Sequence, residues 1–239
     1  MRASVAMAVY NGEKYLNQQI QSIQKQLSVE DELVISYNVS TDKTLEIIRS
    51  YAERDPKIKV IICEAAGVKE NFTNAVEHCS GSYIFFSDQD DVWFDNKLER
   101  VLQTFRETGA SMVIHNARYT DADLNVQPGT IFQERRTGTG VLRNIIKGGF
   151  FGCCMAFKRE LTEYIFPLPD EITSHDMWAG LLARLYGKLV LLDEELLYYR
   201  RHDSTLTPTK HFPLSVMLKN RYLLVKNLLI RRAQLRVKK

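Results

Sequence analysis

The sequence lacks any long apolar run, which argues against a membrane-spanning helix. No stretch approaches the ~20 consecutive apolar residues that a bilayer span requires, and the N-terminus has no signal-peptide pattern. Only six of the 239 residues are proline and 26% are charged, a composition typical of a globular chain. With 45% hydrophobic residues, the chain can bury a sizeable core. We therefore expect one or two globular domains in the cytoplasm, or held peripherally on the inner face of the cell membrane.

The sequence also has few cysteines, and their spacing argues against a disulfide framework or a zinc site. Cys63 and Cys79 stand alone and Cys153 is followed directly by Cys154, so no Cys-x-x-Cys pair exists. We expect reduced thiols packed in the interior.

Acidic residues are missing from the end of the chain. All 29 acidic residues precede Lys210, whereas nine of the 32 basic residues lie from Lys210 onward. Apolar residues alternate with these basic ones from residue 213, a pattern typical of an amphipathic helix at a membrane interface. An anionic membrane surface is the predicted partner of this tail. A helix packed on the rest of the chain is the alternative, and no nucleic-acid partner is expected.

Strands and helices alternate in the first half of the chain. Buried strands are predicted at residues 3–9, 33–37, 58–62 and 83–86, with a helix after each of the first three. This order predicts an α/β fold with a mainly parallel central sheet flanked by helices. Tyr10, Asn38 and Asp88 each follow a strand, so three loops should face one crevice at the carboxyl ends of the strands.

The second half is less regular. We expect strands at 112–115, 153–157, 188–192 and 196–199, and a helix at 175–186. The polar, glycine-bearing segment 120–140 is predicted to be a mobile loop.

The fourth strand ends in Ser87-Asp88-Gln89-Asp90-Asp91. Alternate side chains of an extended segment point the same way, so Asp88 and Asp90 can converge on a hard cation such as Mg²⁺ or Mn²⁺. The alternative is a solvated turn with a helix cap, because Asp is common at both.

Six motifs in this order resemble family 2 glycosyltransferases of the GT-A fold, most closely the rhamnosyltransferase-like subgroup of bacterial polysaccharide biosynthesis. They are VYNGEKYL (9–16), STDKT (40–44), SDQDDVW (87–93), GCCMAF (152–157), HDMW (175–178) and YRRH (199–202). The resemblance implies a hexosyltransferase that inverts the anomeric centre. It would move a sugar such as rhamnose from a dTDP- or UDP-sugar to a saccharide or lipid-linked acceptor. It also implies a catalytic domain at 1–205, with a nucleotide-binding half (1–110) and an acceptor-binding half (111–205), and a helical tail at 206–239.

The resemblance assigns roles to particular residues. The nucleotide and donor would be bound by Ala8, Tyr10, Glu13, Asn38, Lys69, Asn71 and Asp88. Lys69 and Asn71 would touch the pyrophosphate or donor sugar, although they can equally be solvated residues at a helix start. The cation, Mg²⁺ or Mn²⁺, would be bound by Asp88, Asp90 and His202, with Arg200 or Arg201 near the phosphates. His202 can otherwise be a structural or surface histidine.

The resemblance makes Asp176 the candidate general base. An inverting transfer needs a carboxylate near the acceptor hydroxyl, and a helix start favours the ionised form. The alternative is a helix N-cap.

One departure from the family pattern concerns the base-reading loop. The family usually has Asp-Asp-Gly where this chain has Tyr37-Asn38-Val39. Asn38 keeps an acceptor oxygen but loses the charge, so Asn38→Asp is expected to strengthen donor binding. Val39 replaces a glycine that can adopt a positive φ. A non-catalytic, nucleotide-sugar-binding paralogue is therefore the alternative function. A nucleotidyltransferase is a third class, but it needs a glycine-rich phosphate loop after the first strand, which residues 11–14 do not provide.

Overall fold

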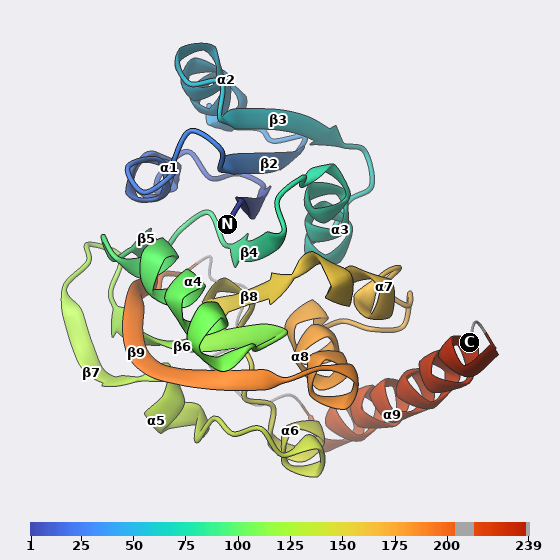
Figure 1. Cartoon of the computed structure of the whole chain (residues 1–239). Helices are drawn as coiled ribbons and strands as arrows, with labels where there is room; N and C mark the ends of the chain where they lie inside the picture. Colours follow the sequence, from blue (N-terminus) through green and yellow to red (C-terminus); the bar gives the residue numbers. More distant parts are fainter. Residues whose placement is uncertain (204–212, 238–239) are drawn as a thin grey trace.

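The computed structural model describes residues 1–203 and 213–237 (Figure 1). In the first half, β1 (Ala3–Val9), β2 (Glu32–Asn38), β3 (Ile58–Cys63) and β4 (Tyr83–Ser87) alternate with α1 (Leu16–Gln24), α2 (Thr44–Arg54) and α3 (Val68–His78). These elements agree with the sequence prediction. The reason is that each strand is a short, almost continuous apolar run, as expected for strands covered on both faces.

The second half contains the remaining elements. They are β5 (Val92–Trp93), α4 (Lys97–Thr108), β6 (Met112–Thr120), β7 (Val126–Thr130), α5 (Ile131–Arg135), α6 (Val141–Lys147), β8 (Met155–Lys158), α7 (Thr162–Ile165), α8 (His175–Tyr186), β9 (Leu189–Arg200) and α9 (Leu214–Val237). Short 3₁₀ turns at Gly152–Cys154 and Arg159–Leu161 flank β8.

One nine-stranded sheet runs through the described part of the chain. Its order is β3-β2-β1-β4-β8-β6-β9-β5, with β7 paired to β6. The strands β3, β2, β1 and β4 are parallel, whereas β8 is antiparallel to both β4 and β6. The sheet is therefore parallel across the first half and mixed beyond β4. The expected α/β architecture with flanking helices is confirmed.

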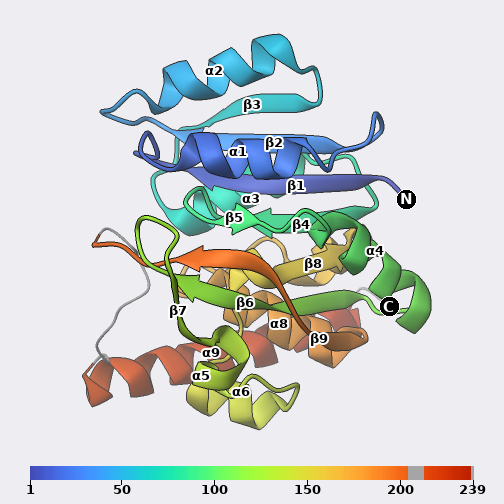
Figure 2. The ribbon, with the colours of Figure 1, turned by 90° about the vertical axis from the view of Figure 1, so that its left-hand side faces the viewer.

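Helices cover both faces of this sheet. Figures 1 and 2 place α1 and α4 on one face and α3, α7 and α8 on the other. A single hydrophobic core runs through both halves, and the Phe86 and Phe157 rings meet across it with centroids 5.0 Å apart. The parallel strands all end at the same edge of the sheet. The loops that carry the candidate site follow them at that edge.

The structure corrects three local predictions. Segment 120–140 was expected to be a mobile loop but contains β7 and α5, which pack on β6. The two strands expected at 188–192 and 196–199 are one strand, β9, whose pairing with β6 shifts register between them. The strand expected from Cys153 begins at Met155, because Gly152–Cys154 form a 3₁₀ turn. Each of these three segments pairs with β6 or packs on it. The sequence around each segment does not reveal that partner.

Helix α4 was not anticipated from the sequence. Its start lies directly after the acidic motif, and it ends at Gly109, which has the left-handed conformation (φ 65°) typical of a helix C-terminus. Of the predicted tail, residues 206–212 and 238–239 lie outside the described residues.

Candidate active site

Three loops at the carboxyl ends of β1, β2 and β4 are joined by hydrogen bonds. Gln89 binds the backbone of Tyr10 twice, accepting from its N–H and donating to its carbonyl oxygen, each at 2.8 Å. Asn11 Oδ1 accepts from the Thr41 N–H at 2.9 Å. Gly12 leaves room for this arrangement, because a Cβ there would lie 2.7 Å from Gln89 Oε1. The three loops that follow these strands therefore contact one another, as their shared edge of the sheet predicts.

Asp90 and His202 are brought together although they are far apart in the sequence. Asp90 Oδ2 lies 2.9 Å from His202 Nε2, and the His202 ring lies 4.6 Å from the Tyr15 ring, centroid to centroid. The His202 side chain is only 8% exposed. Two of the three predicted cation ligands, Asp90 and His202, therefore lie in contact. They offer a carboxylate oxygen and an imidazole nitrogen to a cation.

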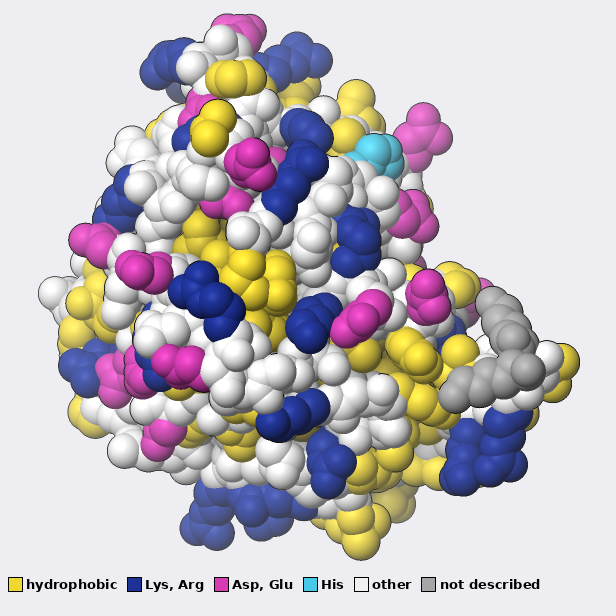
Figure 3. Space-filling model, in the orientation of Figure 1, with side chains coloured by type: hydrophobic (Ala, Val, Ile, Leu, Met, Phe, Trp, Pro, Cys, Tyr) yellow, Lys and Arg dark blue, Asp and Glu magenta, His cyan; other side chains and the backbone are white. Residues whose placement is uncertain are grey.

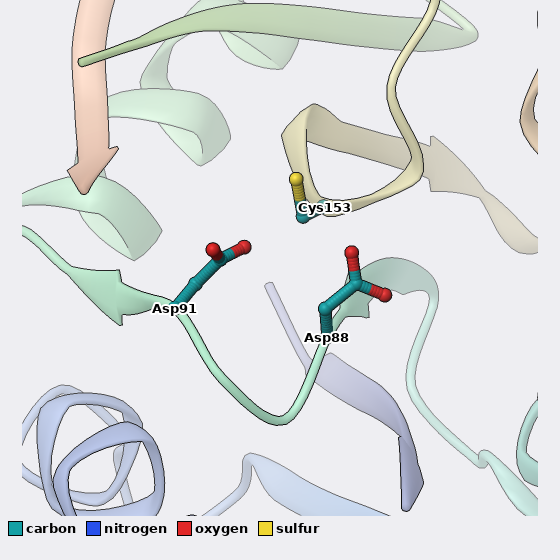
Figure 4. Close-up of side chains that lie close together, drawn as sticks. All are labelled: Asp88, Asp91 and Cys153. Carbon is teal, nitrogen blue, oxygen red and sulfur yellow. The ribbon is translucent and has the colours of Figure 1, made fainter. Parts of the chain in front are cut away.

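Asp88, the third predicted ligand, lies in a cluster with Asp91 and Cys153. One possible ligand atom from each lies within 4.8 Å of the others, and Figure 4 shows the three side chains close together. Burial, together with the charges of Asp90 and Asp176, raises the pKa of Asp88 to about 7. The proposed cation ligands and the candidate base are thus electrostatic neighbours.

Asp91 is a buried member of this cluster, although the sequence did not indicate a place for it there. It is 1% exposed, and burial followed by the charges of Asp90 and Asp88 raises its pKa well above the usual range. Its Oδ2 atom has no hydrogen-bond partner among the described residues. An excess of buried negative charge with an unpaired oxygen fits a divalent cation at this loop.

Lys97 supplies a positive charge beside the cluster. Its ammonium donates to the Cys153 carbonyl oxygen at 2.8 Å and lies 3.9 Å from the Trp93 ring centroid. Burial lowers the pKa of Lys97 to about 8, while Asp91 and Asp88 act in the opposite direction. Sequence reasoning missed Lys97, and the only available signal was its position six residues after Asp91.

Several of the predicted nucleotide-binding residues lie at or near the carboxyl end of β1. Tyr10 is 55% exposed and Ala8 is half-buried in β1. Glu13 accepts from the Lys43 N–H at 2.8 Å, and Asn71 Nδ2 donates to the Val9 carbonyl oxygen at 3.1 Å. The Asn71 Oδ1 atom is buried without a partner in the described chain. These positions place an exposed aromatic ring and an unpaired amide oxygen near the end of β1.

Lys69 has different surroundings. Its ammonium is 3.3 Å from the Asp170 carbonyl oxygen and 3.2 Å from Glu70 Oε1. It therefore bridges α3 to the segment that precedes α8.

Asn38 has a fixed orientation in β2. Its side-chain nitrogen donates to the carbonyl oxygens of Cys63 at 2.8 Å and Ala65 at 2.9 Å. Both amide hydrogens are used, which turns the Oδ1 atom away from these carbonyls. Val39 is not among the described residues with positive φ, so the valine fits this loop without the strain expected from replacing glycine.

Asp176 lies in the first turn of α8, one residue inside the helix. Its Oδ1 atom accepts from the Met177 N–H at 2.7 Å and from the Ser174 hydroxyl. The N-cap residue is Ser174, not Asp176. Ser174 makes no side-chain cap bond, so the Asp176 carboxylate is the group that accepts from a free N–H of the first helical turn.

The preceding residue, His175, is packed between aromatic rings. Its ring stacks on Phe72 with centroids 4.5 Å apart, and burial lowers its pKa. Gly152 is required beside it, because a Cβ there would approach His175 Nε2 to 2.9 Å. Gly152 thus lets the β8 segment pass close to the start of α8 and positions Asp176.

A cavity of about 800 Å³ opens at Asp176. Residues of α6, the 148–151 segment, the 171–177 segment and α9 line it, including Asn144, Phe151, Asp176, Met217, Asn220 and Leu224. Its size lies within the usual range for small-molecule sites. The C-terminal helix therefore forms one wall of the cavity that contains the candidate base.

The inner face of α9 is anchored to the body of the chain. Arg231 is 7% exposed and donates to the carbonyl oxygens of Tyr164 at 2.7 Å and Phe166 at 3.2 Å. Lys226 pairs with Glu171 at 3.1 Å. The packed-helix alternative thus describes this face, while Leu218, Tyr222 and Leu229 on other faces are 58%, 67% and 62% exposed. None of the described helices is long and apolar enough to cross a membrane.

Several relatives carry glycosyltransferase names. An uncharacterised glycosyltransferase of Nostoc sp. is 28% identical over 85% of this chain and 66% of its own length. The putative teichuronic acid biosynthesis glycosyltransferase TuaG of Bacillus subtilis is 29% identical over 87% of this chain and 82% of its own. The dTDP-rhamnosyl transferase RfbG of Shigella flexneri is 34% identical over 40% of this chain and 35% of its own.

Solved structures show the same fold. Staphylococcus aureus TarS 1–349 in complex with UDP-GlcNAc has a TM-score of 0.75 at 21% identity, over 94% of this chain and 65% of its own. The Pyrobaculum calidifontis mannosyltransferase PcManGT in complex with GDP-Man and Mn²⁺ has a TM-score of 0.64 at 20% identity, over 83% of this chain and 56% of its own. The chain thus spans just under two thirds of the Nostoc protein and of the TarS 1–349 fragment. These likenesses confirm the GT-A fold.

The sequence matches the family described as Glycosyl transferase family 2 over residues 4–166, which is more than half of the chain. The matched region contains all three crevice loops and the acidic cluster. The chain belongs to glycosyl transferase family 2.

Proposed function

We propose that this protein is an inverting, metal-dependent glycosyltransferase of polysaccharide biosynthesis. The observation that carries the proposal is the position of Asp88, whose carboxyl group feels the charges of both Asp90 and Asp176. Asp90 also contacts His202. A cation held by Asp90 and His202 would therefore lie near the carboxylate of Asp176, which borders a separate cavity. A transfer reaction requires such a pair of neighbouring places, one for the donor and one for the acceptor.

In the proposed reaction, Asp176 accepts the proton of the acceptor hydroxyl. The acceptor oxygen forms a bond to the anomeric carbon as the bond from that carbon to the diphosphate oxygen breaks, which inverts the anomeric centre. Asp88, Asp90 and His202 would hold the cation, whose chemistry is to offset the charge of the departing nucleoside diphosphate. One of these three ligands is an imidazole, and Mg²⁺ prefers oxygen ligands. The three residues together therefore favour Mn²⁺ over Mg²⁺.

The proposed donor is a dTDP- or UDP-sugar. Tyr10 offers an exposed ring to the base, and Asn38 offers its Oδ1 atom as an acceptor for an imide hydrogen. The names of RfbG and the TarS complex, which specify dTDP-rhamnose transfer and UDP-GlcNAc, support these two nucleotides. Rhamnose is one of the sugars to be tested.

The proposed acceptor is a saccharide or a lipid-linked saccharide that enters the cavity beside Asp176. In Figure 3, hydrophobic and basic side chains lie side by side over α9, and that helix has no acidic residue. We propose that its outer face meets an anionic membrane surface, which would bring a lipid-linked acceptor to the cavity wall.

A donor panel tests the proposed function. Release of nucleoside diphosphate is measured for UDP-, dTDP- and GDP-sugars with Mn²⁺, with Mg²⁺ and with EDTA. We expect turnover of at least one UDP- or dTDP-sugar that requires the cation and is lost in Asp90→Asn. The matched control is Asp95→Asn, an exposed carboxylate near the same loop that pairs with Lys25.

The alternative is a non-catalytic nucleotide-sugar-binding paralogue. The substitution of the family Asp-Asp-Gly by Tyr37-Asn38-Val39 favours it. Cation-dependent donor binding by calorimetry without turnover of any donor, with or without saccharide acceptors, would establish this alternative.

A further inference from the structure

We propose that Arg200 is the positioning residue of the candidate cation site. It would hold Asp90, Asp91 and His202 in register, without contacting cation or substrate. The inference rests on the proposed function, because it explains how a site assembled from two distant segments keeps its geometry.

Arg200 binds the acidic loop at two consecutive residues. Its backbone N–H donates to Asp91 Oδ1 at 3.1 Å, and its Nε–H donates to the Asp90 carbonyl oxygen at 2.7 Å. The residue is only 3% exposed, so these bonds are shielded from water. The end of β9 and the loop after β4 are thereby joined at the two positions that flank the Asp90 side chain.

The rest of the guanidinium reaches two further elements. Nη2 donates to Gln18 Oε1 of α1 and Nη1 donates to the Ala122 carbonyl oxygen, each at 2.6 Å. The guanidinium carbon lies 4.5 Å from the Tyr15 ring centroid, and the His202 ring lies against the same Tyr15 ring. Arg200 and His202 therefore pack against the same aromatic ring.

This geometry replaces the role expected from the sequence, in which Arg200 would face the phosphates. Each arm of the guanidinium donates to the protein, and only the planar fork of arginine can donate in these three directions at once. A lysine at this position would keep the charge but satisfy at most part of the network. The adjacent Arg201 provides the contrast, because it pairs with Glu134 at 2.9 Å and lies over the Tyr119 ring.

The test compares Arg200→Lys with Arg100→Lys by two independent readouts. Arg100 is the control because it lies on α4 and pairs with Glu194 of β9 at 2.7 Å, outside the candidate site. The first is Mn²⁺ affinity in the presence of uridine diphosphate, measured by the electron paramagnetic resonance signal of free Mn²⁺. The second, without metal, is the pair of ¹⁵N shifts of the His202 ring at fixed pH, which report its contact with Asp90. We expect Arg200→Lys to weaken Mn²⁺ binding at least tenfold and to move the His202 shifts. Arg100→Lys should change the affinity by less than about twofold.

Unchanged His202 shifts in a folded Arg200→Lys protein would overturn the positioning role, as would unchanged Mn²⁺ affinity. If the wild type binds no Mn²⁺, the metal-dependent part of the proposed function fails, and the His202 shifts still decide the role of Arg200. If Arg200→Lys does not fold, Gln18→Ala is tested instead. Gln18 lies on the surface of α1, and its side chain accepts one of the hydrogen bonds that the Arg200 guanidinium donates. The same shift in the His202 signals is then expected, and its absence would count against the proposal.

Discussion

At the scale of single residues, the candidate base is the most direct test of the proposed mechanism. Asp176→Asn keeps the size of the side chain but removes its capacity to accept a proton. We expect sugar transfer to fall by about 10²–10⁴-fold while donor and cation affinity stay nearly unchanged.

The measurement is the rate of product formation at saturating donor, with donor affinity from calorimetry. Asp170→Asn is the control, because this fully exposed carboxylate lies in the same segment outside the cavity. A near-wild-type rate for Asp176→Asn would remove it from the mechanism, and Asp91 or Glu171 would be tested next.

The structure reverses the expectation for Asn38→Asp. Both hydrogens of the Asn38 amide bind backbone carbonyl oxygens, and a carboxylate cannot donate to either. The substitution would place an oxygen against two carbonyl oxygens inside a buried strand end. We now expect a destabilisation of about 1–3 kcal/mol and no gain in donor affinity.

Urea unfolding and calorimetry with uridine diphosphate measure the two effects. Asn17→Asp is the control substitution, because this exposed side chain accepts from the Tyr51 hydroxyl through Oδ1 and a carboxylate can accept the same bond. Tighter donor binding by Asn38→Asp at unchanged stability would restore the original interpretation of this loop.

At the scale of elements, α9 has two faces with different tasks. Its inner face is anchored through Arg231, whereas its outer apolar residues are exposed between basic ones. We expect the protein to co-sediment with anionic liposomes at low salt and to dissociate at high salt. Each Lys or Arg at the surface should contribute about 1 kcal/mol.

The variant that separates the faces is Leu218→Ser combined with Leu229→Ser. Because both side chains are exposed, liposome binding should be lost while the unfolding temperature is unchanged. Binding to neutral liposomes as strong as to anionic ones would contradict the electrostatic part, and binding that survives the double substitution would leave α9 as a packed helix only.

At the scale of the whole molecule, the edge of the sheet opposite the site depends on one buried carboxylate. Glu32 accepts from Ser4 Oγ at 2.5 Å, from the Ser80 N–H at 2.5 Å and from Lys59 Nζ at 2.6 Å. Burial of the carboxyl acts to raise the pKa of Glu32, but the combined bonds to Lys59, Ser4 and Ser80 outweigh it and lower the pKa to about 2. Glu32 thus joins β1, β2, β3 and the turn before β4.

This shift predicts a pH dependence of stability. The folded-state pKa of Glu32 is below its ordinary value of 4.5, so the stabilisation is fully present above pH 4.5 and is lost as the pH falls toward 2. Glu32→Gln should cost about 1–3 kcal/mol at pH 7. The difference in urea unfolding free energy between wild type and variant should shrink between pH 4.5 and 2. The exposed Glu30→Gln is the control, and a difference that does not depend on pH would contradict the ionic role.

Local pattern determined much of this molecule. Continuous apolar runs specified β1 to β4, and their order with the intervening helices specified a sheet with the ligand crevice at its carboxyl edge. The spacing within Asp88-Gln89-Asp90-Asp91 marked the loop for cation chemistry, and His175-Asp176 marked the start of α8. These features depend on residues close together in the chain, which is why sequence reasoning reached them.

Tertiary structure alone decided which distant groups meet. The pairing of His202 with Asp90, the link from Arg200 to Asp91, and the neighbourhood of Lys97 and Cys153 each join segments that the sequence separates. The sequence did not predict that Asp91 and Cys153 lie beside Asp88, because only the folded chain carries the Asp91 side chain into the core. Burial and long-range contacts set the charges and orientations of these groups, and neither quantity is a property of the local sequence.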